Sequence, residues 1–217
     1  MGGYALSLSS RPYVLGITGT YCSGKSTLGK LLADSLDPQQ VLHIEVDHLG
    51  HEALENQKDA VVQRFGKEIL TDRDHTIDRK ILGSIVFQNP AGLADLEAIV
   101  HPAMIARVES LIASFTGELV ILNAAILHKM GLHRHCHGIW FVDAPVLFRL
   151  FRAMKRDALS IASAYRRISH QKSILTQLPR RYADIRRVSN WGGKWFLRRK
   201  LVNLIRTALE NNQGVGN

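Results

Sequence analysis

A glycine-rich segment near the N-terminus limits the possible folds of this chain more than any other feature. The pattern G-x-x-x-x-G-K-[ST] is matched by eight consecutive residues: Gly19, Thr20, Tyr21, Cys22, Ser23, Gly24, Lys25 and Ser26. An apolar run, residues 13–18, precedes them, and a helical pattern, residues 27–33, follows. This strand–loop–helix order is the context in which the pattern forms a phosphate-binding loop. A chance match in a glycine-rich turn is the alternative, and the flanking elements disfavour it.

Such a loop has a defined chemistry. Its backbone N–H groups surround phosphates at the positive end of a helix. In this chain Lys25 would reach the β- and γ-phosphates, and the Ser26 hydroxyl would bind Mg²⁺. We therefore predict that residues Gly19 to Thr27 bind a nucleoside triphosphate together with Mg²⁺.

Composition favours a single globular domain. With 217 residues, of which 46% are hydrophobic and 22% charged, the chain can bury a substantial core and could carry lobes. Its two cysteines are too few for a disulfide framework, which is typical of a reducing compartment, so we expect the cytoplasm. We expect no signal peptide, because residues 1–10 have neither a charged lead nor a long apolar run. We expect no membrane span, because no apolar run approaches about 20 residues.

Positive charge is concentrated in the C-terminal part. The net charge is +9, and residues 149–206 hold sixteen Lys and Arg against two acids, Asp157 and Asp184. This distribution is compatible with nucleic-acid binding, with a site for triphosphate and a phosphorylated acceptor, or with solvated helix faces. Of these we favour the phosphate site over nucleic acid.

Hydrophobic periodicity predicts a three-layer α/β fold. Apolar runs without alternation suit strands of a parallel sheet that is covered on both faces. The predicted strands are 13–18, 41–46, 118–123 and 138–143. The predicted helices are 27–33, several between 49 and 114, with separate ones at 93–100 and 102–114, and then 146–161, 161–176 and 194–209. The helices after the second strand form an insertion.

Candidate site residues follow from this topology, because ligands collect at the carboxyl ends of parallel strands. Besides the phosphate loop, Asp47, Asn123 and Asp143 lie there. Asp47 could accept a hydroxyl proton, help to order Mg²⁺ or only cap the next helix. For Asp143, followed by Ala144-Pro145, we favour a turn-forming role.

Two further clusters suggest a ligand site, but for each we favour a purely structural role. His128, His133, His135, Cys136 and His137 suggest a metal site, but their spacing matches no closed four-ligand set, so we favour packed or solvated histidines. Aromatic residues follow in the basic C-terminal part. Trp191, Trp195 and Phe196 could stack on nucleic-acid bases, but we favour a helix anchored on the core.

Further motifs occur in a specific order along the chain. They are Asp47–Leu54, Ile77–Leu82, Val86–Phe87, Asn89–Pro90, Leu96–Glu97, His101–Pro102, Val142–Pro145, Arg152, Arg156–Asp157, Arg167–Gln171, Ala183–Asp184 and Ser189–Asn190. Together with the phosphate loop, this set resembles the dephospho-coenzyme A kinases, P-loop kinases that phosphorylate the ribose 3′-hydroxyl of dephospho-CoA from ATP. The resemblance extends from about Tyr13 to Leu204.

The resemblance implies roles for individual residues. Asp47 would be the general base, Arg156 would meet the transferring phosphoryl group, and Asn190 would lie near the adenine. Arg79 and His101 would contact the acceptor. Within one P-loop kinase domain, 1–217, it implies a nucleotide-binding core of 11–48, 116–145 and 190–210, a helical acceptor-binding lobe of 49–115 and a helical lid of 146–189.

The chain departs from the family pattern at several positions. Thr20 and Cys22 stand where the loop usually has glycine, which restricts positive φ angles. Asn123 stands where the family has Asp, and Lys129 where it has Glu. Arg149 replaces a common Gln. These changes could alter metal handling, but the retained Lys25, Ser26, Asp47 and lid arginines favour an active kinase.

Two other functions remain open from sequence alone. One is a P-loop kinase of another small hydroxyl acceptor, such as a nucleoside. The other is a nucleotide-gated protein that binds nucleic acid or regulates a partner without kinase activity. A GTPase is disfavoured, because the chain has no Asn-Lys-x-Asp guanine signature.

Overall fold

The structure, a computed structural model, describes residues 12–71, 75–170, 184–191 and 194–214. The chain forms two compact units. One comprises Met1–Ile44 with Ile112–Asn217, and the other comprises Glu45–Leu111.

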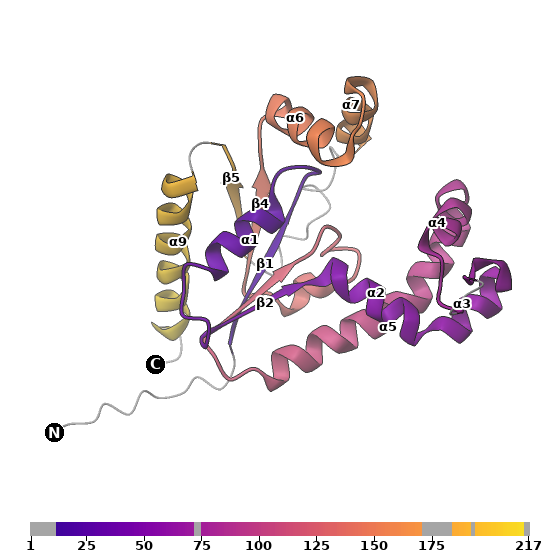
Figure 1. Cartoon of the computed structure of the whole chain (residues 1–217). Helices are drawn as coiled ribbons and strands as arrows, with labels where there is room; N and C mark the ends of the chain where they lie inside the picture. Colours follow the sequence, from indigo (N-terminus) through magenta and orange to yellow (C-terminus); the bar gives the residue numbers. More distant parts are fainter. Residues whose placement is uncertain (1–11, 72–74, 171–183, 192–193, 215–217) are drawn as a thin grey trace. The chain divides into compact units, whose positions relative to one another are not determined.

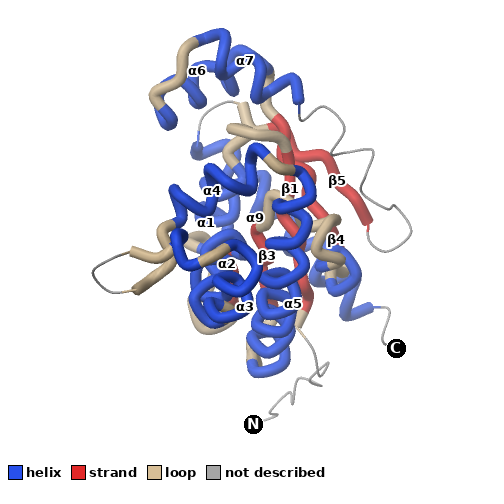
Figure 2. The backbone as a smooth tube through the Cα atoms, turned by 90° about the vertical axis from the view of Figure 1, so that its right-hand side faces the viewer, coloured by secondary structure: helices blue, strands red, loops and turns tan. Residues whose placement is uncertain are grey.

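The first unit is built on a five-stranded sheet. Its strands are β1 (Tyr13–Gly19), β2 (Val41–Glu45), β3 (Leu119–Asn123), β4 (Gly138–Asp143) and β5 (Asp184–Ser189), in the order β2-β3-β1-β4-β5. β1 pairs in parallel with β3 and β4, and β4 pairs in parallel with β5. Figure 2 shows these strands side by side. The sheet confirms the predicted parallel α/β class and the four predicted strands.

Hydrophobic periodicity did not indicate strand β5. It lies at the sheet edge, and Val188 is its one buried residue, whereas Arg186 and Arg187 are exposed. An edge strand with charged residues lacks the apolar run that identifies a central strand. Residues 184–189 therefore join the sheet, although they fall in the range expected for the lid.

Helices α1 (Lys25–Ala33) and α9 (Lys194–Gly214) cover one face of the sheet (Figure 1). The core on this face joins Leu28 and Leu32 of α1 to Leu201 and Ile205 of α9, over strand side chains that include Ile17. Because Leu28 and Leu32 fix α1 in this core, the N-terminus of α1 is held at the end of β1. The core therefore positions the phosphate loop.

The opposite face is covered closely by the segment after β3. A Cβ on Gly16 of β1 would lie 2.8 Å from both Cys136 Sγ and Leu127 Cδ2, so these buried side chains would have to shift if Gly16 carried a side chain. The segment contains the short helix η2 (Leu132–His135), and Leu127 and Leu132 are fully buried. The central strands β1, β3 and β4 are thus buried on both faces, as their continuous apolar runs predict.

Helices α6 (Val146–Asp157) and α7 (Ile161–His170) follow β4. Ala153 of α6 and Ala164 of α7 are fully buried in a small cluster that also contains Cys22. The phosphate loop and α6 therefore share a packed contact. The predicted helix to Thr176 extends outside the described residues.

The second unit is helical. It contains α2 (Val46–Asn56), α3 (Lys58–Phe65), η1 (Lys67–Ile69), α4 (Arg79–Gln88) and most of α5 (Pro90–Ser114). Asp78 caps α4, since its carboxylate accepts from the N–H groups of Lys80 at 2.8 Å and Ile81 at 3.2 Å. α5 continues through Pro102, so the prediction of two helices there was wrong. Across the described residues, the helices lack the combination of length and hydropathy that a bilayer span requires.

Candidate nucleotide-binding site

The phosphate loop depends on two glycines with positive φ. Gly19 ends β1 at φ +152°, and a Cβ there would lie 2.0 Å from the carbonyl oxygen of Val142. Gly24, at φ +88°, precedes α1 as its N-cap. Side chains are excluded at both positions, so the chain turns tightly from the strand into the helix. Backbone N–H groups and the helix dipole stabilise an anion at a helix N-terminus.

Cys22 also adopts a left-handed conformation, at φ +56°. This is one of the two positions at which the sequence departs from the family's glycines, and the structure keeps the positive φ without glycine. Such a conformation costs about 1–3 kcal/mol in a residue with a Cβ and persists only where the surroundings fix it. The Cys22 side chain is buried next to Ala153 and Ala164, which supplies that support.

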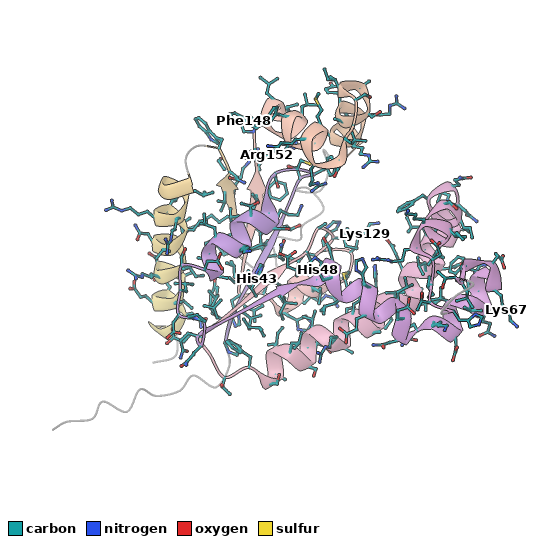
Figure 3. The ribbon with its side chains drawn as sticks, in the orientation of Figure 1. His43, His48, Lys67, Lys129, Phe148 and Arg152 are labelled. Carbon is teal, nitrogen blue, oxygen red and sulfur yellow. The ribbon has the colours of Figure 1, made fainter. Side chains whose placement is uncertain are left out.

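Three consecutive carbonyls of the loop accept hydrogen bonds from α6 and from the end of β5. Arg149 Nε donates to the Tyr21 carbonyl at 2.9 Å. Arg152 Nη1 donates to the carbonyls of Ser23 at 2.9 Å and Cys22 at 3.4 Å, and Asn190 Nδ2 donates to Ser23 at 2.7 Å. Figure 3 shows Arg152 on the side of α6 that faces the loop. These side chains, which do not belong to the loop, stabilise its conformation by binding its carbonyl groups.

Arg149 is the most buried cation of this group, with 7% of its surface exposed. Burial lowers the pKa of its guanidinium, and the nearby Asp143 carboxylate opposes that shift. The sequence analysis noted Arg149 only as a departure. Its role as a contact of the loop depends on packing between segments 128 residues apart, which the motif spacing does not encode.

A cavity of about 660 Å³ opens between the loop and α6. It is lined by Cys22, Gly24, Lys25, Ser26, Thr27, Phe151, Arg152, Lys155 and Arg156. The lining holds four cationic side chains and no carboxylate, so it is suited to a polyanion such as a triphosphate. It brings together five of the predicted loop residues and Arg156, whereas Phe151 and Lys155 were not predicted.

Asn190 lies against Gly24, which lines this cavity. Asn190 is buried, and its Nδ2 would lie 2.2 Å from a Cβ on Gly24. Gly19, Thr20 and Tyr21 form the part of the loop before the cavity lining. Asn190 therefore contacts the loop directly.

The donor set around Ser26 fits Mg²⁺ bound together with phosphates. Asn123 is buried at the carboxyl end of β3, and its Nδ2 lies 3.2 Å from Ser26 Oγ. A hydroxyl oxygen, phosphate oxygens and water are the hard ligands that Mg²⁺ prefers. Because Asn123 is neutral, this part of the site offers less negative charge than a carboxylate would.

Asp143 does more than form a turn. Its Oδ1 accepts from the Ala144 N–H at 2.9 Å and from Thr20 Oγ1 at 3.3 Å, and its Oδ2 pairs with Arg187 of β5. Burial alone would raise the pKa of Asp143, but these hydrogen bonds outweigh burial and lower the pKa below its usual value. Asp143 thus connects the loop to the edge strand.

The other predicted residues lie in the second unit. Asp47 is exposed in the first turn of α2, whose N-cap is Glu45, so the expectation that Asp47 could cap this helix was wrong. Arg79 is exposed at the first position of α4, and His101 is partly buried within α5.

The histidines of the cluster differ in burial, since His128 and His135 are half-buried and His137 is exposed. His133 is buried, and His137 Nδ1 accepts from the Val14 N–H at 2.9 Å while its ring stacks on Tyr13 at 5.2 Å between centroids. Within the part of the chain that the structure describes, no group of three or more His, Cys, Asp or Glu could hold a metal ion.

The expected aromatic anchor is wrong for Trp191. Its side chain is 65% exposed and lies outside the helices. The side chains of Trp195 and Phe196 fall outside the described residues.

Replacing Gly24 by alanine is expected to weaken ATP binding at least tenfold, because the new Cβ would collide with Asn190 Nδ2 and displace the loop. Calorimetric titration with ATP measures this effect. Gly131→Ala is the matched control: its φ of +72° adds comparable backbone strain, but nothing lies within 4 Å of the new Cβ. Equal losses of ATP affinity in both variants would contradict the collision.

Comparison with known proteins agrees with this geometry. The dephospho-CoA kinase family model matches residues 13–186. The dephospho-CoA kinase of Lactobacillus johnsonii is 32% identical over 89% of this chain and 96% of its own length. Among solved structures, Thermus thermophilus TT1252 superposes with a TM-score of 0.74 and 30% identity, covering 91% of this chain and 98% of its own. The dephospho-CoA kinase from Campylobacter jejuni superposes with a TM-score of 0.65 and 25% identity, covering 92% of this chain and 98% of its own. A phosphate loop at the end of β1, a basic cavity beside it and a match over most of the chain place this protein in the dephospho-CoA kinase family.

Proposed function

We propose that this protein transfers the γ-phosphoryl group of ATP to the ribose 3′-hydroxyl of dephospho-CoA and so forms coenzyme A. Membership of the dephospho-CoA kinase family carries the reaction and the acceptor. The observation that carries the mechanism is the cavity, in which Lys25 of the phosphate loop faces a volume shared with Arg152, Lys155 and Arg156 of α6. Phosphoryl transfer needs this concentration of positive charge, because negative charge spreads over the transferred group in the transition state.

The cationic side chains would act on the triphosphate. Lys25 would contact the β- and γ-phosphates, and Arg156 would stabilise the transferring group. Ser26 would be the protein ligand of Mg²⁺, with phosphates and water as the other ligands. Mg²⁺ held there would neutralise part of the negative charge of the triphosphate.

The acceptor side is assigned to the second unit and the lid. Asp47 would accept the proton of the 3′-hydroxyl as that oxygen attacks the γ-phosphorus, and the bond to the bridging oxygen of ADP breaks. Arg79 and His101, within the range 49–115, would contact dephospho-CoA. Residues 146–183 would form the lid, and closure of a basic lid excludes water from the reaction.

A direct assay tests this function. Purified protein, ATP, Mg²⁺ and dephospho-CoA are expected to give coenzyme A, detected by mass spectrometry as a gain of one phosphoryl group. Adenosine and shikimate, each offered at the same concentration together with dephospho-CoA, are expected to compete poorly. Binding of ATP without formation of coenzyme A, or preferential phosphorylation of a competing acceptor, would contradict the proposal.

A further inference from the structure

Arg156 lies in a small cluster at the end of α6. Its Nε donates to Asp157 Oδ1 at 2.8 Å, and its Nη2 donates to Oδ2 at 3.0 Å. The guanidinium carbon lies 5.2 Å from the centroid of the Tyr21 ring, in a cation–π contact. The Tyr21 hydroxyl also donates to Asp157 Oδ2. One arginine is therefore held by a carboxylate along its edge and by an aromatic ring against its face.

The protonation states of Asp157 and Tyr21 agree with these hydrogen bonds. Hydrogen bonds from Arg156 and Tyr21 lower the pKa of Asp157 to about 2, so its carboxylate is ionised at any ordinary assay pH. Burial and the bond to Asp157 raise the pKa of Tyr21, so its hydroxyl stays protonated and donates. Arg167 of α7 is a further cation that faces both Tyr21 and Asp157.

A surface ion pair between neighbouring residues would ordinarily mean little, since such pairs contribute about 0–1 kcal/mol. Two observations distinguish this one. Tyr21 comes from the phosphate loop, 136 residues from Asp157, so the cluster connects the loop to α6. Arg156 also lines the cavity although its side chain is 62% exposed, and an exposed arginine without such contacts would sample many rotamers.

We propose that Asp157 and Tyr21 are positioning residues, which hold the Arg156 guanidinium at the wall of the cavity before the triphosphate arrives. Asp157 fixes the guanidinium edge through Nε and Nη2. The edge that points away from Asp157 would meet the phosphoryl group. Tyr21 connects this orientation to the phosphate loop. The transition state then gains the full interaction without ordering a flexible side chain. The inference rests on the proposed function, because it assumes that Arg156 meets the transferring group.

Kinetics of Asp157→Asn and Tyr21→Phe test the positioning role. Each change keeps the shape of the side chain but removes the negative charge or the hydroxyl. We expect kcat to fall about three- to tenfold, the range that corresponds to immobilising one flexible side chain, with KM for ATP changed less than twofold. Because the pKa of Asp157 is about 2, the kcat ratio of wild type to Asp157→Asn should be constant from pH 6 to 9.

A double-mutant cycle separates positioning from general support of the fold. In an Arg156→Ala background, Asp157→Asn is expected to cause no further loss of kcat, since the group that it orients is gone. Asp34→Asn, an exposed position at the far end of α1, and Tyr13→Phe, at the opposite end of β1 from the loop, are the matched controls. Additive losses in the cycle, with an active wild type, would overturn this inference alone and leave the proposed function standing.

A measurement independent of turnover keeps the inference testable if the wild type forms no coenzyme A. We expect a resolved ¹⁵N-NMR signal for Arg156 Nε–H, assigned by its absence in Arg156→Lys, and exchange broadening of this signal in Asp157→Asn. A signal of equal sharpness in both proteins would show that Asp157 does not order Arg156.

Discussion

Replacing Lys25 by alanine is expected to lower kcat by about 10²-fold or more, because electrostatic stabilisation of the transferring phosphoryl group is the main catalytic contribution in this chemistry. Lys25 is the first residue of α1 and lines the cavity with three cations of α6. Those cations belong to another helix, so they cannot replace a charge that projects from the loop itself. Steady-state kinetics with ATP and dephospho-CoA measure the loss.

The control for this prediction is Lys30→Ala. Lys30 is exposed in the last turn of the same helix, so the substitution makes the same change of charge and side-chain length away from the loop. It is expected to leave kcat within twofold of wild type. A Lys25→Ala protein that turned over within a fewfold of wild type would remove Lys25 from the mechanism, whatever its effect on ATP affinity.

The sequence was most informative where function depends on contiguous residues. The phosphate loop is one segment of eight residues between a strand and a helix, so its pattern alone predicts both its conformation and its ligand class. Even the departure at Cys22 was informative, because a non-glycine residue at a position of positive φ must be supported by packing.

The contacts between distant segments could not be predicted in this way. Arg149 and Lys155 belong to a basic amphipathic helix, and nothing in their spacing indicates which of its arginines contact loop carbonyls and which line the cavity. The same is true of Tyr21 and Asp157. Only the packing of α6 against the loop brings these residues together, and packing depends on side-chain shape rather than on periodicity.

Charged residues and a proline made two other elements hard to predict. β5 is an edge strand whose arginines interrupt any apolar run, so it was not predicted. Pro102 suggested a helix boundary, yet α5 continues through it. An interior proline removes one backbone hydrogen bond and crowds the carbonyl four residues earlier, and the rest of this 25-residue helix outweighs that cost.

Asp47→Asn is the second substitution with a large expected effect. If Asp47 accepts the proton of the 3′-hydroxyl, kcat should fall about 10²- to 10⁴-fold, the range for loss of a general base. ATP affinity should stay unchanged, because Asp47 lies in the helical unit and not among the residues that line the cavity. Turnover and calorimetric titration with ATP measure the two quantities on the same protein.

Asp59→Asn is the matched control for this substitution, since Asp59 is an exposed acid in the first turn of α3, as Asp47 is in α2. Both variants lose one favourable interaction with a helix dipole, about 0.3–1 kcal/mol, so their thermal stabilities should be similar. Only Asp47→Asn should lose turnover. If both variants kept wild-type kcat, the acceptor hydroxyl would need no carboxylate at this position, and Asp47 would only stabilise the start of α2. If only Asp47→Asn lost turnover, while both variants had the same thermal stability and the same ATP affinity, Asp47 would be assigned to the chemical step. Neither stability nor nucleotide binding could then explain the difference in kcat.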